Sequence, residues 1–322
     1  MNFILSCIVL AFAVNAQDMD LGVLNYALTL EHLENAFYKQ GMSNFTLDHF
    51  DKGGYSKEVR GVFERISSHE EIHVSTLISV INATYPGMAV PPCEYAFGVT
   101  SVKEFVATAR ALERTGVSAY LGRVADITAK PYLTAAGTIV TIEARHASFL
   151  NVISGISGMP EPFDTPLDAT TVVSIASQFI KSCPYDLGVK PYSKLSASKD
   201  GSNLKLSDLG SGGNMTSTVF CKFLYGAMTM FTEVKDGSCM YPENAKGDTY
   251  VFVVSDNTTT GNILYGPAIV SGMAEKSING KGSGGGSVSG GGSGSGSASS
   301  SSWKLDTDMS LLMLVASFVY MM

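Results

Sequence analysis

His69-Glu70-Glu71-Ile72-His73 is the stretch on which the interpretation of this chain depends, because it supports two kinds of metal chemistry. Counted from His69, it is an H-E-x-x-H motif, in which two imidazoles four residues apart on a helix bind zinc. Counted from Glu70, it is an E-x-x-H motif. Glu70 and His73 are then three residues apart and project from one face of a helix, so both can reach a metal inside a helical bundle.

Residues 1–16 have the features of a secretory signal peptide. An apolar run from Phe3 to Val14 is followed by Val14-Asn15-Ala16, which places small residues where signal peptidase cuts. The basic residues that usually precede such a run are missing. We expect Gln17 to be the first residue of a mature protein that is exported to the cell surface.

The C-terminal residues have the three parts of a glycolipid (GPI) anchor signal. Small residues occur at Ser297-Ala298-Ser299, with Ser297 as the approximate attachment site, and a polar spacer, Trp303 to Asp308, and an apolar tail, Met309 to Met322, follow. The tail is shorter than the roughly 20 residues that span a bilayer. We expect residues 303–322 to be removed and the lipid to hold the chain at the membrane. The alternative is a tail anchor or a cleaved segment without this role.

Sequons and cysteines also indicate the secretory pathway. Four asparagines precede x-Thr in glycosylation sequons: Asn44, Asn82, Asn214 and Asn257. Without Cys7 of the signal segment, four cysteines remain, and none lies in a C-x-x-C motif. We expect the disulfides Cys93–Cys183 and Cys221–Cys239, with four buried thiols or a metal site as the alternative. The net charge of −7 argues against nucleic acid as a partner.

Residues 17–184 have the apolar periodicity of a helical bundle. Four long helices are expected over 19–41, 56–82, 101–127 and 131–154, and a shorter fifth helix over 165–181. Ser56 and Thr165 are suited to cap their helices, and Ser101 forms a capping box with Glu104. Gly41 is expected to end the first helix, before a loop over residues 42–55. The predicted fold is mainly α, a four-helix bundle with a short fifth helix.

Residues 185–276 are expected to form a smaller, β-rich, sandwich-like domain. Apolar residues alternate over 218–223, 227–234 and 249–255, which is typical of strands. Asp236-Gly237 is a hairpin turn signal. Residues 277–302 are rich in glycine and serine and are expected to form a stalk, because they have almost nothing to bury.

The chain contains two half-repeats that favour the E-x-x-H interpretation. Glu143 and His146 repeat the spacing of Glu70 and His73. Each of these helices follows a helix with a glutamate and a tyrosine seven residues apart, first Glu31 with Tyr38 and then Glu113 with Tyr120. Four carboxylates and two imidazoles facing one bundle interior can bind two ions of the iron or manganese type.

These features resemble the ferritin-like superfamily. More closely, Leu24 to Glu34 (Leu-Asn-Tyr-Ala-Leu-Thr-Leu-Glu-His-Leu-Glu) is similar to the opening helix of secreted fungal ferritin-like proteins, which resemble plant desiccation-related proteins. The resemblance covers Leu21 to Pro184. It implies six metal ligands: Glu31, Glu70, His73, Glu113, Glu143 and His146. It also implies that Glu70 and Glu113 bridge the two ions. Glu34 lies one turn from Glu31 and could substitute for it, and His69 becomes a neighbour of the ligands.

Other interpretations of the same residues stay open at this stage. A zinc protease would leave the second E-x-x-H unexplained and lacks a third ligand, since His32 and His49 lie outside the required context. The six residues taken singly would be solvent-facing side chains of amphipathic helices. Tyr38 and Tyr120 are expected either to bond the metal-binding carboxylates and carry electrons, or only to pack. A set of methionines suggests copper, although core filling is favoured: Met215, Met228, Met230 and Met240.

The sequence thus predicts a cell-surface protein with a dinuclear iron or manganese site and no organic cofactor. Such a site would support Fe(II) oxidation, peroxide removal or substrate oxidation, and the chain would be an oxidoreductase. The alternative is a non-catalytic cell-wall or stress-protective protein with the same fold. The expected partners are the membrane, through the GPI lipid, and cell-wall glycan. Storage in a closed cage is disfavoured, because glycans, an appended domain and a tether would obstruct a shell.

Overall fold

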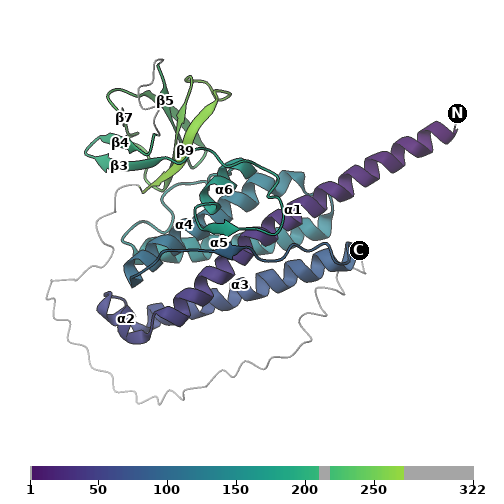
Figure 1. Ribbon diagram of the computed structural model, residues 1–322, viewed down its shortest axis with the longest axis horizontal. Coiled ribbons are helices and arrows are strands. Elements are labelled where there is room, and N and C mark those ends of the chain that lie inside the picture. Colours follow the sequence, from purple (N-terminus) through teal and green to yellow (C-terminus); the bar gives the residue numbers. More distant parts are fainter. Residues whose placement is uncertain (1, 210–217, 272–322) are drawn as a thin grey trace, which may run out of the picture. The chain divides into compact units, whose positions relative to one another are not determined.

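The computed structural model describes residues 2–209 and 218–271, with side chains from Met19 onward (Figure 1). Its helical part contains four long helices: α1 (Asn2–Asn44), α3 (Lys57–Thr84), α4 (Val102–Arg123) and α5 (Lys130–Ile153). Helix α1 packs on α3, α4 packs on α5, and α1 also contacts α4. The shorter elements are α2 (Leu47–Lys52), the 3-10 helix η1 (Val124–Asp126) and α6 (Ala169–Ala176). The predicted four-helix bundle with a short fifth helix is confirmed.

The beginnings of the long helices follow from local chemistry that the sequence contains. Ser56 precedes α3, and its hydroxyl accepts a hydrogen bond from the backbone N–H of Val59. Ser101 and Glu104 form the reciprocal capping box at the start of α4. Pro131 occupies the first turn of α5, where its missing N–H costs nothing. These three predicted starts are therefore correct.

The end of the first helix and the loop after it differ from the prediction. Helix α1 continues past Gly41 to Asn44. A Cβ atom at Gly41 would collide with the ring of Phe105, so the glycine allows a close approach of α4 instead of ending the helix. The predicted loop over 42–55 contains α2, whose Phe50 side chain is fully buried in the core of the bundle.

The short fifth helix is also shorter than predicted. It is capped by Asp168, whose carboxylate accepts from the backbone N–H of Thr171, and not by Thr165. It ends at Ala176, and a turn over residues 177–179 leads into β2 (Ile180–Ser182), which pairs antiparallel with β1 (Glu94–Tyr95).

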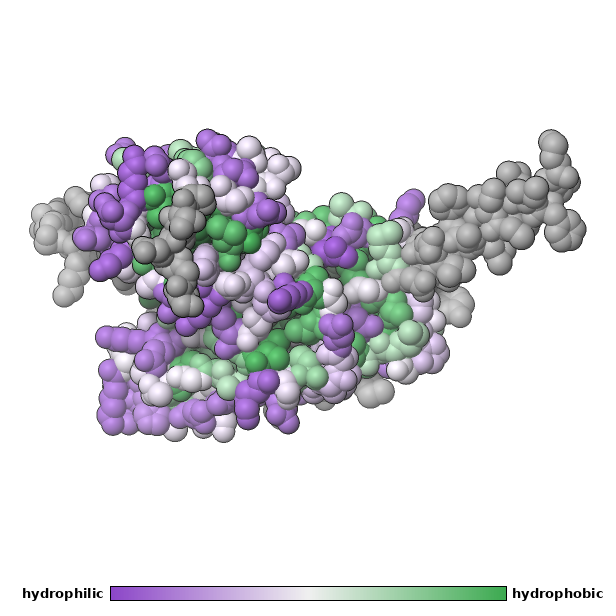
Figure 2. All heavy atoms as spheres, turned by 45° about the horizontal axis from the view of Figure 1, so that its top comes forward, coloured by the Kyte–Doolittle hydropathy of each residue, from purple (hydrophilic) through white to green (hydrophobic). Residues whose placement is uncertain are grey.

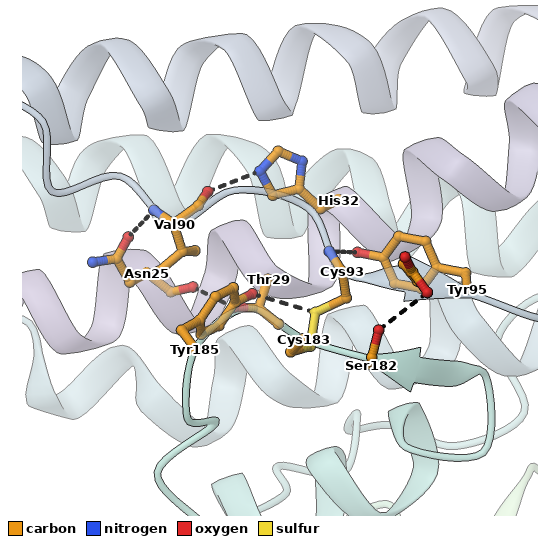
Figure 3. Close-up of a disulfide and its surroundings, with 10 residues drawn as sticks. Asn25, Thr29, His32, Val90, Cys93, Tyr95, Ser182, Cys183 and Tyr185 are labelled. Carbon is orange, nitrogen blue, oxygen red and sulfur yellow. Dashed lines mark hydrogen bonds between the residues drawn. A yellow bond between two sulfur atoms is a disulfide. The ribbon is translucent and has the colours of Figure 1, made fainter.

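The Cys93–Cys183 disulfide lies at the ends of this two-stranded sheet and is shown in Figure 3. The hydroxyl of Tyr185 lies 3.6 Å from Cys93 Sγ and 3.1 Å from the hydroxyl of Thr29 on α1. The disulfide therefore ties the connection between α3 and α4 to the segment after α6, and Tyr185 joins both to α1. The pairing predicted from the sequence is confirmed.

The β-rich region consists of two antiparallel sheets. One has the order β3-β4-β7, with β3 (Ser196–Asp200), β4 (Asn203–Ser207) and β7 (Ser238–Met240). The other has the order β6-β5-β8-β9, with β5 (Phe220–Tyr225), β6 (Met228–Glu233), β8 (Thr249–Val254) and β9 (Ile263–Val270). The second predicted disulfide, Cys221–Cys239, is present and joins β5 to β7, so it links the two sheets.

The turn at Asp236-Gly237 connects the sheets instead of forming a hairpin within one of them. Both residues have positive φ angles, 51° and 70°, as a type I′ turn requires. The strands on either side of the turn, β6 and β7, belong to different sheets, and Lys235 and Ser238 form only an isolated bridge. The predicted hairpin turn is present and is closed by two backbone hydrogen bonds between Lys235 and Ser238, although its flanking strands continue into different sheets.

Strand β8 holds the β-rich region and the bundle together. All six of its residues are buried. Val251 and Val253 belong to the core between the two sheets, whereas Tyr250, Phe252 and Val254 belong to the hydrophobic core of the bundle. The hydroxyl of Tyr250 lies 3.0 Å from that of Ser118 on α4. The sequence of β8 is therefore almost continuously apolar, because one face of the strand packs in the core between the sheets and the other packs in the core of the bundle.

Figure 2 shows one face of the molecule, on which hydrophilic residues interrupt the apolar surface. Within residues 2–209 and 218–271, no helix combines the length and apolar character needed to cross a bilayer. Several predicted features lie outside the described residues, namely Asn214, Met215, the stalk over 277–302, Ser297 and the anchor signal over 303–322.

The two disulfides are expected to stabilise the fold unequally. The Cys93–Cys183 bond joins residues separated by 90 positions and the Cys221–Cys239 bond by 18. In the chain-entropy treatment the longer loop restricts the unfolded chain more, by about 1.4 kcal/mol. The double variant Cys93→Ala/Cys183→Ala should therefore lose more free energy of unfolding in denaturant titrations than Cys221→Ala/Cys239→Ala. An equal or reversed order would contradict this.

Candidate metal centre

The six side chains predicted as ligands converge from four helices. They come from α1 (Glu31), α3 (Glu70, His73), α4 (Glu113) and α5 (Glu143, His146). The four glutamates are 0% exposed, and the two histidines are 8% and 5% exposed. Complete burial excludes the alternative in which these acids are solvent-facing residues of amphipathic helices.

The ligand atoms form two overlapping groups whose members lie within 4.8 Å of one another. One group contains Glu31 and His73, the other contains Glu113 and His146, and Glu70 and Glu143 belong to both. Glu113, which was expected to bridge with Glu70, belongs to one of these groups only, so the geometry favours Glu143 as the second shared carboxylate. The shared carboxylates are those of the two E-x-x-H motifs, and Glu113 belongs to one position only.

Both histidines turn Nδ1 toward the carboxylates. Nδ1 of His73 lies 3.2 Å from Glu31 Oε2, 3.1 Å from Glu70 Oε2 and 3.3 Å from Glu143 Oε1. Nδ1 of His146 lies 3.0 Å from Glu113 Oε2 and 3.3 Å from Glu70 Oε1. The two half-repeats of the sequence thus become two matching halves of one site.

Each of the two tyrosines forms a hydrogen bond to the glutamate of the other half-repeat. Tyr38 on α1 donates a hydrogen bond of 2.6 Å to Glu113 on α4, and Tyr120 on α4 donates one of 2.6 Å to Glu31 on α1. Each bond uses Oε1, which leaves Oε2 of the same carboxylate beside a histidine. The predicted bonds to the carboxylates are therefore present, and each tyrosine orients the glutamate of the other half-repeat.

His69 lies beside the site and belongs to neither group. Its Nδ1 is 2.9 Å from Nε2 of His146, and the two rings are stacked. Partial burial and the neighbouring His146 lower the pKa of His69. A zinc site of the H-E-x-x-H kind needs His69 and His73 on one ion, and the structure directs His69 to His146 instead.

The buried carboxylates repel one another. Burial, reinforced by neighbouring carboxylates, raises the pKa of Glu34, Glu70 and Glu143 well above the ordinary value. Burial also acts to raise the pKa of Glu31, but hydrogen bonds from His73 and Tyr120 lower it overall. For His73, burial lowers the pKa, and the surrounding carboxylates outweigh this and raise it.

The residues fit two metal ions. Three carboxylate oxygens accept no hydrogen bond from a described residue, although a histidine Nδ1 lies 3.3 Å from each of the first two: Glu70 Oε1, Glu143 Oε1 and Glu143 Oε2. Buried ionised oxygens without partners are costly unless a cation pairs with them. These are oxygens of the two shared glutamates, which is where bridging ligands would bind. Hard carboxylate oxygens with one imidazole nitrogen for each position match iron or manganese.

One residue of the site was not singled out from the sequence. Gly116 on α4 faces the carboxylates of Glu34 and Glu143, both 2.9 Å from where its Cβ atom would lie. The signal that would have identified it is the alignment of the half-repeats. In that alignment Glu34, three residues after Glu31, corresponds to Gly116, three residues after Glu113.

Comparisons with known proteins agree with this geometry. Residues 19–155 match the ferritin-like domain family. Protein rds1 of Schizosaccharomyces pombe is 23% identical over 167 residues, which are 52% of this chain and 40% of that protein. The match thus spans less than half the length of this relative. These findings support the ferritin-like superfamily for the helical region.

A solved structure of a conserved hypothetical protein from Mycobacterium tuberculosis is also similar. It covers 48% of this chain and 99% of that protein's chain, with 17% identity and a TM-score of 0.38. A score this low carries no argument about the site.

The metal-free protein is expected to lose stability as the pH rises. Burial raises the pKa of Glu70 and Glu143 in the folded chain above the ordinary value of 4.5. As the pH rises above 4.5, these carboxyls lose their protons in the unfolded chain but keep them in the folded chain. The free energy of unfolding therefore decreases until the pH reaches the raised pKa values. His73 acts in the same direction above 6.5. Glu31, with its lowered pKa, changes stability only below 4.5 and does not offset this decline.

Thermal unfolding of chelator-treated protein between about pH 5 and pH 8 tests this expectation. The variant Glu143→Gln, which imitates the protonated acid, should show a smaller decline. A melting temperature that increases throughout this interval would contradict the prediction.

Proposed function

We propose that the ferritin-like domain of this chain, residues 19–155, holds two iron or manganese ions between its four long helices and serves oxidative chemistry at the cell surface. One observation carries the proposal. Two overlapping groups of carboxylate and imidazole ligands share Glu70 and Glu143, and all four glutamates of these groups are completely buried.

Six side chains of the chain would act as metal ligands. Glu70 and Glu143 would bridge the two ions, Glu31 and His73 would complete one position, and Glu113 and His146 the other. Two iron or manganese ions bound here would supply electron exchange with dioxygen or peroxide.

The surrounding side chains would keep this site rigid and dry. Tyr38 and Tyr120 fix the orientation of the terminal carboxylates through their 2.6 Å hydrogen bonds. The ring of Tyr38 packs against Phe63 and Phe105, which are themselves completely buried. Locked side chains around ligands preserve the metal geometry.

The proposed location at the cell surface has support from the described residues. Asn44, Asn82 and Asn257 of the predicted sequons are exposed, so a glycan can be attached to each without unfolding. The two disulfides suit an oxidising compartment. Anchoring through a GPI lipid near Ser297, with the membrane and cell-wall glycan as partners, rests on the sequence alone.

A second candidate function is a non-catalytic surface protein in which the metal stabilises the fold. The observation that favours it is the burial of the site, since carboxylates with 0% exposure offer a bound substrate no direct contact. Both candidates require the metal. They differ in whether the loaded protein consumes dioxygen or peroxide.

Metal content is the first test. The full chain secreted from a eukaryotic host should carry about two ions, and Glu70→Gln/Glu143→Gln should lose both because each ion would lose its bridging ligands. Glu71→Gln is the matched control, since this neighbour of Glu70 has a side chain that is 62% exposed. Elemental analysis after gel filtration gives the count, and circular dichroism confirms that each variant is folded.

A folded wild-type protein that is free of metal and resists loading with Fe(II) or Mn(II) would contradict the proposal. Oxygen-electrode and peroxide-decay measurements on the loaded protein then separate the two candidates. Consumption that disappears in Glu70→Gln/Glu143→Gln supports oxidative chemistry, and the absence of any consumption supports the structural role.

A further inference from the structure

The two halves of the metal centre correspond residue by residue, with a difference inside the bundle. Glutamate matches glutamate, tyrosine matches tyrosine and E-x-x-H matches E-x-x-H between α1–α3 and α4–α5. Glu34 on α1, however, corresponds to Gly116 on α4.

Gly116 is needed for the space that its missing side chain leaves, and not for an unusual backbone conformation. It lies within α4 and has no positive φ angle, so nothing in its conformation requires glycine. Glycine in a helix interior is less stable than alanine. A Cβ atom at this position would lie only 2.9 Å from Glu34 Oε1 and 2.9 Å from Glu143 Oε2, which is closer than real contacts of this kind. The missing side chain therefore makes room for the Glu34 carboxylate beside Glu143.

Glu34 lies beside the shared carboxylate of Glu143, although it belongs to neither of the two ligand groups. Tyr38 on α1 reaches Glu113 on α4, and Tyr120 on α4 reaches Glu31 on α1, so the two helices run past each other in opposite directions. Glu34 stands between Glu31 and Tyr38 in the chain. Along α1 it therefore lies between the two tyrosine–glutamate hydrogen bonds, and its carboxylate is next to Gly116 on α4.

The surroundings of Glu34 disfavour its ionised form in the metal-free chain. Its side chain is 3% exposed, and the charges that act on it most strongly all come from other carboxylates: Glu143, Glu113, Glu31 and Glu70. A cavity of about 10 Å³ lies beside Glu34 and Gly116, which is room for about one water molecule. One water cannot balance an ionised carboxylate, whereas a cation between these acids can.

We propose that Glu34 is a fifth carboxylate ligand of the dinuclear centre and that Gly116 is the space that admits it. The inference rests on the proposed function, because it needs metal in the bundle. A side chain at position 116 would displace the Glu34 carboxylate, since a Cβ atom there already lies 2.9 Å from Glu34 Oε1. The asymmetry between the half-repeats fits this role of Glu34.

A fifth carboxylate changes which metal charge the centre prefers. Four carboxylates neutralise two divalent ions, with neutral imidazoles adding no charge. Glu34 adds one further negative charge, which stabilises trivalent ions more than divalent ions. Removing this charge should therefore weaken metal binding and raise the reduction potential of an iron-loaded centre.

The test is a cobalt(II) titration of the metal-free full-length chain, followed by visible absorption and calorimetry. Glu34→Gln keeps the size of the side chain and removes its charge, and it should weaken binding by at least about tenfold. It should also alter the cobalt absorption, which reports the ligand set. Gly116→Ala should weaken binding too, because its Cβ displaces both carboxylates.

Two controls separate this role from effects on packing. Glu71→Gln removes an exposed carboxylate of α3, and Gly137→Ala adds a Cβ to a helical glycine of α5 that has nothing within 4 Å, so both should bind cobalt as the wild type does. The exchange Glu34→Gly/Gly116→Glu moves the carboxylate to the corresponding position of the other half-repeat. It should recover most of the affinity lost in Glu34→Gln.

The outcomes distinguish this inference from the proposed function. If the wild type binds two ions and Glu34→Gln binds them with unchanged affinity, absorption and potential, Glu34 is not a ligand and only the inference fails. If the wild type binds no metal, the proposed function fails. Loss of binding in Glu34→Gln with recovery in the exchanged variant supports the inference, and a folded exchanged variant without recovery overturns it.

Discussion

Four glutamate side chains are completely buried between the four long helices. Other groups of the structure must therefore compensate the negative charge of these carboxylates. Each isolated ionised acid in an apolar interior would cost several kcal/mol. His73 and His146 approach the carboxylates with Nδ1, and Tyr38 and Tyr120 donate to two of them. These groups do not satisfy every oxygen, which is why the arrangement makes physical sense as a cation site.

The same interactions set the register of the bundle. Because each tyrosine bonds to a glutamate of the other half-repeat, α1 and α4 can slide past each other only by breaking both bonds. Every residue of α4 from Leu112 to Ala119 is buried, since this helix faces the carboxylates on one side and other elements on the rest of its surface. Tyr250 of β8 contacts Ser118 there, so the β-rich region supports the helix that carries Glu113.

Sequence patterns identified the residues of the site because helical spacing determines which side chains share a face. The repeat of E-x-x-H and the two glutamate–tyrosine pairs were sufficient to place all six side chains in one interior. The pattern could not show which carboxylates lie between the two positions, since that depends on how the helices cross. For this reason Glu113 was expected to bridge, whereas Glu143 is the residue shared by both groups.

The errors in the fold have similar causes. Gly41 has the character of a helix end, but a ring from another helix, that of Phe105, decides its role. Strand β3 has a mostly polar sequence, and β4 is short, so its alternation rests on only two buried residues, Leu204 and Leu206. Strand β8 was recognised as a strand, but nothing local shows that its two faces belong to two different cores. Propensity and pattern describe a segment, whereas these features depend on contacts with distant segments.

The two halves of the centre have the same ligand types and are nevertheless not equivalent. Nε2 of His146 is engaged by His69, and the residue that corresponds to His69 in the other half-repeat is Ile142, which has no nitrogen to offer His73. His69 is partly exposed, so the His146 side of the centre is one side chain away from solvent. Glu34 and Gly116 add a second difference beside the shared carboxylate of Glu143. A duplicated helical pair provides matching ligands, and single-residue departures from the duplication then give each metal position its own surroundings.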